Sequence, residues 1–506
     1  MQLATLLKNI DIVQLHGDPV REISSLACDS RKVEDGSVFF ALPGVQSDGF
    51  DFIPQALQAG AVAVVTERLS DERVEGVCYL QVANVRKTMA RIASDYNGNP
   101  TDGIPVIGVT GTNGKTSITY LLEAILRQAG YAPAVFGTVE YRFGNECFES
   151  THTTPESLEL MAMMGQFRRQ GADAIILEVS SHALEQHRVD GIAFDVAVFT
   201  NLTPEHLDYH QNLDNYFASK RRLFSELLGQ GKAAINRDDG FGRQLLAEND
   251  QWCSFGETEK AAVHPLDLAV GRNGISGSFL SPQGKIDIDS GMIGHFNVSN
   301  LLAAVSAAQL LGIDNLAISA GVAAAPQVPG RLEKVENDHD ILALVDYAHT
   351  GDALEQVLKT LSKLESKRLI TLVGCGGDRD PSKRPVMAAA AGKYSDLSIF
   401  TSDNPRTEDP LQILEQVRAG ALAAGAFELS EPQVTAGEKG FVVIPGRRQA
   451  ITFACAQAKA GDLLLVAGKG HEDYQILGTG KIHFDDREEL ALALSASVSR
   501  GANNDV

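Results

Sequence analysis

The feature that most constrains the fold is a glycine-rich stretch, GVTGTNGKTS, at residues 108–117. It follows a short apolar run, PVIGV, and precedes SITYLLEAILRQAG, whose apolar residues recur at helical spacing and end at Gly130. Glycines let backbone N–H groups approach a phosphate, and a helix N-terminus attracts negative charge. The order strand, glycine loop, helix therefore predicts a nucleotide site on a parallel α/β sheet.

The loop departs from the common phosphate-binding pattern G-x-x-x-x-G-K-[ST]. Gly114, Lys115 and Thr116 supply its end, but Val109 stands where the first glycine is expected, and Gly111 lies inside the loop. A lysine for the β- and γ-phosphate oxygens and a hydroxyl for Mg²⁺ are still present. The loop predicts ATP and Mg²⁺ as cofactors but leaves the use of ATP open.

The length predicts about three domains, at roughly 150 residues each. Two stretches dense in Pro, Gly or Asn, at 96–105 and 325–333, separate the periodic segments. We predict domains at 1–101, 102–328 and 329–506. Alternating strand and helix patterns predict α/β folds throughout: a small first domain, a central doubly wound, mostly parallel sheet, and a Rossmann-like third domain.

The net charge of −21 argues against broad binding to nucleic acid or to a membrane surface, because both need clustered Lys and Arg. Lys8 and Asp11 interrupt the first apolar run, and no later run approaches the roughly 18 residues that span a bilayer. The six cysteines are scattered singly, without metal or redox spacing. We expect a cytoplasmic protein with reduced thiols.

Two acidic or histidine-rich segments follow the loop. AIILEVSSH ends a predicted strand at Glu178, and VFTNLTPEHLDYH places His206 after another. An isolated histidine more commonly has a structural role. After a phosphate loop, however, an acid at the end of a neighbouring strand is well placed to hold Mg²⁺.

The third domain contains four apolar runs that end in polar loops. Arg379 lies in GGDRD, residues 403–406 read DNPR, and Glu472 lies in GKGHED. Ligands bind beyond the carboxyl ends of strands in open parallel sheets, and Arg offers a rigid fork for a carboxylate. Solvated surface ion pairs are the alternative. We expect a site for a zwitterionic ligand.

With these residues in place, the chain resembles the Mur ligases, the ATP-dependent amide-forming enzymes of peptidoglycan synthesis, and especially their meso-diaminopimelate-adding branch. The resemblance rests on motifs in the family's order along essentially the whole chain: DSR, TGTNGKT, HTTPE, EVSSHALEQHR, TNLTPEHLDYH, YFASK, HFNVSNLLAA, GRLE, VDYAHT, GCGGDRD, DNPRTEDP and GKGHEDYQ.

The resemblance implies a first domain for the UDP-linked substrate, a second for ATP and a third for the incoming amino acid. The UDP-substrate residues would be Cys28, Ser30, Val45, Gln46, Ser47, His152, Thr153, Thr154, Ser180, Gln186 and Arg188. The ATP residues would be Gly111, Thr112, Asn113, Gly114, Lys115, Thr116, Ser117, Asn297, Arg331 and Asp346. The amino-acid residues would be Arg379, Asp403, Asn404, Pro405, Arg406, Gly468 and Glu472.

The resemblance also implies catalytic roles for Lys115, Glu178, His206 and Lys220, with Thr116, Glu178, His206 and Lys220 around the metal. Lys220 would be carbamylated, which turns a cation into a carboxylate-like group. From pattern alone it is an ordinary solvated lysine. His152 stands where several members carry Asn.

The implied substrates are UDP-N-acetylmuramoyl-L-alanyl-D-glutamate and meso-diaminopimelate, used by a monomer through an acyl phosphate. Two alternatives stay open at this point. A folylpolyglutamate synthetase would share the ATP chemistry, although the long first domain with its DSR motif weighs against it. A nucleotide-operated switch would use the loop without forming an amide.

Overall fold

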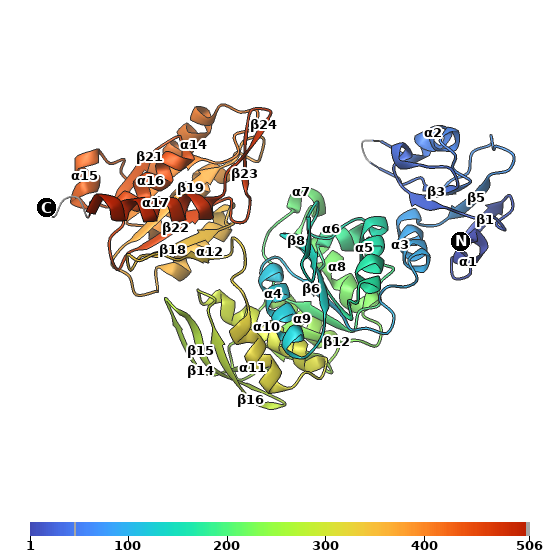
Figure 1. The fold of residues 1–506 in the computed structure, drawn as a ribbon, viewed down its shortest axis with the longest axis horizontal. Helices are drawn as coiled ribbons and strands as arrows, with labels where there is room; N and C mark the ends of the chain where they lie inside the picture. The colour runs from blue at the N-terminus through green and yellow to red at the C-terminus, as the bar shows by residue number, and fades with distance from the viewer. Residues whose placement is uncertain (45–46, 502–506) are drawn as a thin grey trace. The chain divides into compact units, whose positions relative to one another are not determined.

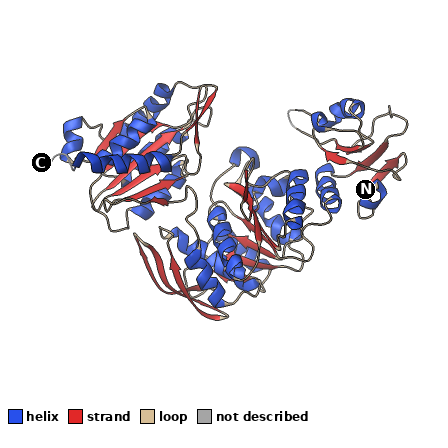
Figure 2. Ribbon diagram, in the orientation of Figure 1, coloured by secondary structure: helices blue, strands red, loops and turns tan. Residues whose placement is uncertain are grey.

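The computed structural model describes residues 1–44 and 47–501 (Figure 1). The chain forms two compact units. Unit 1 contains Met1–Pro265, Phe279–Ile286 and Ser299–Val322, and unit 2 contains Leu266–Ser278, Asp287–Val298 and Ala323–Val506. The predicted α/β class is confirmed, because helices alternate with mostly parallel strands in both units (Figure 2). No helix in the described part of the chain is long and apolar enough to cross a membrane.

The first part of unit 1 is a five-stranded sheet in the order β1-β5-β4-β3-β2. Only β1 runs antiparallel to its neighbour. Successive residues of β3 enter different apolar clusters, Val38 and Phe40 in one and Phe39 in the other, so both sheet faces are covered. The elements are α1 (Leu3–Leu6), β1 (Ile12–His16), β2 (Ser25–Ala27), β3 (Ser37–Phe40), α2 (Ile53–Gln58), β4 (Ala63–Thr66), β5 (Cys78–Val82) and α3 (Val85–Tyr96).

The rest of unit 1 contains an eight-stranded sheet in the order β13-β12-β11-β6-β10-β7-β8-β9. It is parallel except at β8 and β9, as expected for a doubly wound sheet. The strands are β6 (Val106–Thr110), β7 (Pro133–Phe136), β8 (Glu140–Phe143), β9 (Glu146–Glu149), β10 (Ala174–Glu178), β11 (Val196–Phe199), β12 (Lys232–Asn236) and β13 (Cys253–Phe255).

The helices of this region pack around β6 and its neighbours. They are α4 (Lys115–Gln128), α5 (Ser157–Arg169), α6 (Ser181–Glu185), α7 (Leu207–His210), α8 (Leu213–Arg222), α9 (Gly240–Glu248), α10 (Phe296–Leu310) and α11 (Asn315–Ala324). Helix α4 begins at Lys115 and is followed by Gly130 with φ 88°, which confirms the predicted helix and its glycine stop.

A three-stranded sheet follows, formed by β14 (His264–Gly271), β15 (Gly274–Ser281) and β16 (Gly284–Ser290). Sequence analysis made no prediction for it. Its strands have seven or eight residues, and their glycines and small polar residues interrupt the apolar pattern.

Unit 2 is built on a six-stranded sheet in the order β17-β18-β22-β19-β20-β21, antiparallel only at β17. Leu344 and Leu465 enter one apolar cluster, and Val345 and Val466 enter another, so helices cover both faces. The strands are β17 (Glu333–Val335), β18 (Leu342–Asp346), β19 (Leu369–Cys375), β20 (Leu397–Ser402), β21 (Gly440–Val443) and β22 (Leu463–Ala467), with the hairpin β23 (Tyr474–Leu477) and β24 (Gly480–His483).

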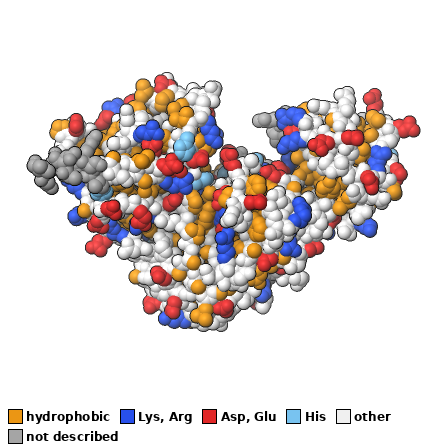
Figure 3. Space-filling view, in the orientation of Figure 1, with side chains coloured by type: hydrophobic (Ala, Val, Ile, Leu, Met, Phe, Trp, Pro, Cys, Tyr) orange, Lys and Arg blue, Asp and Glu red, His pale blue; other side chains and the backbone are white. Residues whose placement is uncertain are grey.

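The helices of unit 2 are α12 (Gly351–Leu361), α13 (Lys383–Tyr394), α14 (Pro410–Ala423), α15 (Glu431–Ala436), α16 (Arg447–Gln457) and α17 (Asp486–Gly501). Acidic side chains are spread over the face of the molecule seen in Figure 3, with Lys and Arg in small groups between them. An anionic ligand must therefore find a local basic pocket.

Candidate active site

The glycine loop lies between β6 and α4, as predicted. Gly111 has φ 144° and Gly114 has φ 91°, values that side chains rarely adopt, and an added Cβ at Gly111 would clash with Thr200 Oγ1. Asn201 holds the loop from β11, because its carbonyl accepts from Thr112 N at 2.9 Å and its Oδ1 accepts from Asn113 N at 2.9 Å. The glycines and these hydrogen bonds thus fix the loop backbone before α4, an arrangement that fits a polyphosphate.

Two lysines meet over this loop. Lys115 Nζ donates to the carbonyl oxygens of Gly111 and Thr112 at 2.9 and 2.8 Å. Lys220 Nζ, from α8, donates to the same Gly111 oxygen at 2.9 Å. The Lys220 side chain is buried, and its Nζ lies 4.6 Å from the centre of the Tyr216 ring. Burial, and then the charge of Lys115, lowers the pKa of Lys220 well below its ordinary value.

Glu178 ends β10, the strand beside β6, and is buried. Its carboxylate accepts from Thr138 N at 3.0 Å and from Thr138 Oγ1 at 2.9 Å, and Thr138 Oγ1 lies 3.1 Å from Thr153 Oγ1. Thr154 Oγ1 donates to the Glu178 carbonyl at 2.7 Å. Glu178 therefore links the strand end to the predicted UDP-substrate loop.

His206 precedes α7 with φ 55° and packs edge-on against His182, with ring centres 4.8 Å apart. Burial lowers the pKa of His206, and the charges of Lys115 and Lys220 lower it further. His206 is thus favoured as a neutral imidazole, the form that binds metals.

The four predicted metal residues are Thr116, Glu178, His206 and Lys220. The described residues contain no cluster of three or more His, Cys, Asp and Glu side chains arranged to hold a metal. Thr116 is buried at the start of α4 and Glu178 and His206 supply hard or borderline donors, so the chemistry of the set suits Mg²⁺ with retained waters. A neutral Lys220 that gained a carboxylate would add the missing oxygen ligand.

Several of the predicted UDP-substrate residues lie together. Arg188 Nη2 donates to Gln186 Oε1 at 2.7 Å, and Arg188 Nη1 donates to the Thr154 carbonyl at 2.8 Å. Thr154 Oγ1 lies 3.4 Å from Ser180 Oγ. Arg188 Nε also pairs with Glu156 at 3.0 Å, a residue that sequence analysis did not select. Its position directly after HTTP was the available signal.

The remaining UDP-substrate predictions have separate surroundings. Ser30 Oγ donates to Gln55 Oε1 at 3.0 Å. Burial raises the pKa of the Cys28 thiol, and the charge of Glu156 adds to the rise. His152 and Ser47 are exposed. Val45 and Gln46 lie outside the described residues.

In unit 2, a cavity of about 290 Å³ opens beyond the carboxyl ends of the adjacent strands β20, β19 and β22. Of the predicted amino-acid residues, all but Pro405 line it: Arg379, Asp403, Asn404, Arg406, Gly468 and Glu472. The convergence of the three charged loops is thus observed. Tyr347, His349, Lys383, Arg384 and Met387 also line the cavity and were not predicted.

The cavity walls are tied to one another. Asn404 Nδ2 donates to Glu472 Oε2 at 2.9 Å, and Arg406 Nη1 donates to the Gly377 carbonyl at 2.7 Å. Arg406 has φ 52°, which is uncommon for a non-glycine residue. Cys375 is buried, and this burial raises the pKa of its thiol to about 12, in agreement with an unreactive residue.

The other predicted ATP residues lie in unit 2. Asp346 is buried at the end of β18 and accepts from Leu332 N and Ala348 N, each at 2.8 Å. The Arg331 guanidinium lies 5.0 Å from the centre of the Tyr347 ring. Asn297 is buried and donates to the Ile293 carbonyl at 2.8 Å. Arg331 and Asp346 therefore form one group beside the strand end.

Comparison with known proteins decides the family. The Mur ligase family catalytic domain matches residues 22–97, the Mur ligase middle domain matches 109–308, and the Mur ligase glutamate ligase domain matches 330–470. The UDP-N-acetylmuramoyl-L-alanyl-D-glutamate–2,6-diaminopimelate ligase of Geobacter sulfurreducens is 50% identical over 99% of this chain and 100% of its own. The chain belongs to the Mur ligase family.

Solved structures agree with this placement. A structure of a UDP-N-acetylmuramoyl-L-alanyl-D-glutamate–2,6-diaminopimelate ligase matches this Mur ligase with a TM-score of 0.73 and 35% identity, over 98% of this chain and 99% of that one. A Mycobacterium tuberculosis folylpolyglutamate synthase complexed with ADP and AMPPCP matches with a TM-score of 0.59 at 18% identity, over 81% of this chain and 95% of that one. The second likeness shows a shared fold alone.

Proposed function

We propose that this Mur ligase joins meso-diaminopimelate to the D-glutamate of UDP-N-acetylmuramoyl-L-alanyl-D-glutamate, with ATP converted to ADP and phosphate, in cytoplasmic peptidoglycan synthesis. The observation that carries the proposal is full-length identity of 50% to a ligase named for these two compounds. The cavity with Arg379, Arg406 and Glu472 supports it, because two guanidinium groups and a carboxylate suit a zwitterion with more than one carboxylate.

The proposed reaction has two chemical steps. The D-glutamate side-chain carboxylate takes the γ-phosphoryl group of ATP to give an acyl phosphate, and the amine then displaces phosphate to form the amide. Charge spreads over the phosphoryl oxygens during transfer, so Lys115 and the backbone N–H groups at the start of α4 would stabilise it. Mg²⁺, when bound, would neutralise phosphate charge.

Individual side chains have distinct proposed tasks. Thr116, Glu178, His206 and carbamylated Lys220 would hold Mg²⁺. Asn297, Arg331 and Asp346 would complete the ATP site. The Arg188 group, with Thr153, Thr154, Ser180 and Gln186, would orient the UDP-linked substrate, and Glu472 would hold the ammonium of the amino acid.

The proposal is tested by supplying ATP, Mg²⁺ and UDP-N-acetylmuramoyl-L-alanyl-D-glutamate with a panel of amino acids and following phosphate release and product mass. Diaminopimelate should give product and lysine very little, since lysine lacks one carboxylate and would leave the half-buried Arg406 guanidinium without that partner. Phosphate release that ignores both substrates would instead indicate a nucleotide switch. Lysine used as well as diaminopimelate would refute the proposed specificity.

A further inference from the structure

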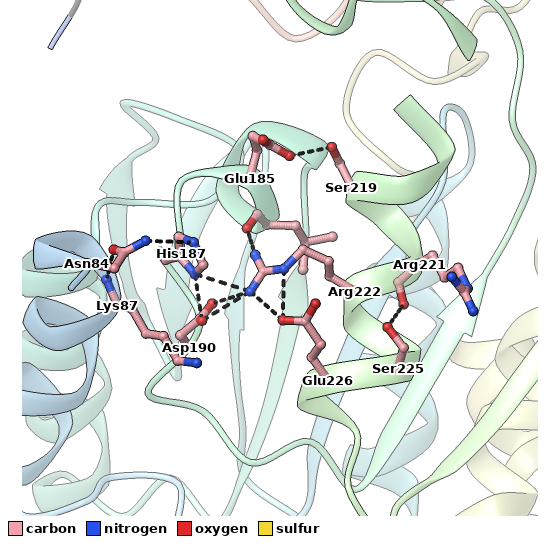
Figure 4. A network of polar contacts seen from close by, with 11 residues as sticks. Asn84, Lys87, Glu185, His187, Asp190, Ser219, Arg221, Arg222, Ser225 and Glu226 are labelled. Carbon is pink, nitrogen blue, oxygen red and sulfur yellow. Dashed lines mark hydrogen bonds and ion pairs between the residues drawn. The ribbon is translucent and has the colours of Figure 1, made fainter. Parts of the chain in front are cut away.

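A polar cluster joins three elements of unit 1: the start of α3, the turn at residues 186–188, and α8 (Figure 4). The turn contains Gln186 and Arg188, both proposed to contact the UDP-linked substrate. The residue between them, His187, has no role in the site described above. Its side chain points toward Asn84, at the start of α3, and toward Asp190 (Figure 4).

The backbone of His187 occupies a position that favours glycine. Helix α6 ends in a Schellman arrangement, in which His187 N donates to the Leu184 carbonyl at 3.2 Å and Arg188 N donates to the Ala183 carbonyl at 2.8 Å. This places His187 in the left-handed region, with φ 56°. A side chain there strains the backbone, and such strain is retained when the side chain is needed.

The side chain of His187 bridges two parts of the unit. Its Nε2 lies 3.3 Å from Asn84 Nδ2, and its Nδ1 lies 2.7 Å from Asp190 Oδ2. Asn84 Oδ1 already caps α3 by accepting from Lys87 N at 2.9 Å, so the amide nitrogen is the atom that faces the imidazole. The amide therefore donates to Nε2, and Nδ1 faces both Asp190 Oδ2 and Arg222 Nη2, the latter at 3.1 Å.

Arg222 anchors the other side of the turn. Its Nη2 pairs with Asp190 Oδ2 at 3.1 Å and Glu226 Oε2 at 2.9 Å, and its Nη1 donates to the Leu184 carbonyl at the end of α6. In the same helix, Ser219 Oγ donates to Glu185 Oε2 at 2.7 Å. Ser219 and Arg222 lie on either side of Lys220 in α8, so the turn is fixed to the helix that carries the buried lysine.

We propose that His187 is a positioning residue for the UDP-linked substrate. By pairing with Asn84, it holds the 186–188 turn against the first turn of α3. Through Asp190 and Arg222, it fixes the positions of Gln186 and Arg188 relative to Lys220 in α8. The inference rests on the proposed function, because it assumes that Gln186 and Arg188 contact that substrate.

Two substitutions separate this role from a structural one. His187→Gly removes the imidazole but relieves the left-handed strain, so the melting temperature should stay equal or rise. Asn84→Ser keeps a good helix cap but removes the carboxamide that reaches His187. Assayed at pH 8.5, each variant should bind UDP-N-acetylmuramoyl-L-alanyl-D-glutamate about tenfold more weakly by calorimetry, the effect of one lost hydrogen bond. The KM values for ATP and diaminopimelate should stay within about twofold.

Arg91→Ala is the matched control, since Arg91 is exposed on α3 and lies 3.8 Å from Asp95 of the same helix. It should leave all three constants unchanged. The double variant should lose no more affinity than either single variant, because the two side chains form one contact.

Unchanged affinity in either single variant, or equal losses for all three substrates, overturns the inference. A wild-type protein that forms no product from the UDP-linked substrate refutes the proposed function itself, whereas altered variants of an active wild type bear on His187 alone.

Discussion

At the scale of single residues, the decisive feature is a buried amine. Within the described part of the chain, Lys220 Nζ donates to the Gly111 carbonyl, which Lys115 also uses. Two ammonium groups on one carbonyl repel each other, and burial penalises charge, so both effects favour a neutral Lys220. A neutral amine can react with carbon dioxide, which is the chemical basis of the proposed carbamate.

Lys220→Met should strongly slow ligation while preserving the fold. Methionine matches the length of the buried stem and removes a group that is costly to charge, so the melting temperature should not fall. Loss of the proposed metal ligand should lower kcat by about a hundredfold or more. Phosphate-release kinetics and thermal unfolding measure the two effects, and a variant with near-normal kcat would contradict the role of Lys220.

Arg406→Ala should weaken the use of diaminopimelate far more than the use of ATP. Arg406 lines the cavity proposed to hold the amino acid, and loss of a charged hydrogen bond there should reduce kcat/KM for diaminopimelate by about a hundredfold. The KM for ATP serves as the internal reference. Equal losses for both substrates would remove Arg406 from the specificity site.

The acid stability of unit 2 should depend on His471. Burial, then the charge of Arg331, lowers the pKa of His471 from 6.5 to about 4. The unfolded chain binds this proton below pH 6.5 but the folded chain does not, so stability should fall as pH decreases from 6.5 to 4 and be flat above.

His471→Phe should reduce this fall, measured as urea midpoints at pH 7 and 4.5. The exposed His483 is the contrasting site: its pKa is raised by a hydrogen bond to Glu488, so His483→Gln should have a small effect of opposite sign. An identical pH profile for wild type and His471→Phe would contradict the first expectation.

At the scale of elements, the loop between β6 and α4 is fixed both by its backbone angles and by the side chains packed against it. The glycines of the loop adopt angles that L-residues avoid, and the ends of β11 and α10 fill the space that a side chain would need. An added Cβ at Gly114 would meet Asn300 Oδ1, and one at Gly111 would meet Thr200. Residues with a side chain therefore fit poorly at Gly111 and Gly114, even though the spacing of these glycines differs from the common pattern.

Gly111→Ala should destabilise unit 1 by about 2–6 kcal/mol, from backbone strain and overpacking together. Gly130→Ala is the matched control, because Gly130 also has positive φ but has no atom within 4 Å of an added Cβ. The control should cost only about 1–2 kcal/mol. Urea unfolding compares the two, and equal losses would show that the close contact with Thr200 is unimportant.

At the scale of the whole molecule, the chain has two compact units with separate cores. Chains of this kind commonly unfold in more than one step. Unit 2 also contains a fully buried ion pair between α16 and α17, in which Arg447 Nη2 lies 2.6 Å from Asp486 Oδ2. Arg448, the residue after Arg447, makes an exposed pair with Glu489 on the same two helices.

Calorimetry should show two unfolding transitions. Arg447→Met should lower the unfolding free energy of one of them by about 3–5 kcal/mol, since Asp486 would be left buried and unpaired. Arg448→Met should change the unfolding free energy of neither transition by more than about 1 kcal/mol. Hydrogen exchange would assign the affected transition to unit 2. A single transition shifted as a whole would show that the units unfold together.

The sequence by itself determined the α/β class, the phosphate loop and the family, because these depend on local periodicity and on residues close together in the chain. It also indicated the charged loops of unit 2, since the carboxyl ends of parallel strands meet at one edge. The burial of Lys220, its shared carbonyl with Lys115 and the bridge from His187 to Asn84 were decided only by the tertiary structure. These contacts join residues about a hundred positions apart, and no local pattern shows whether a lysine on a helix faces water or another strand end.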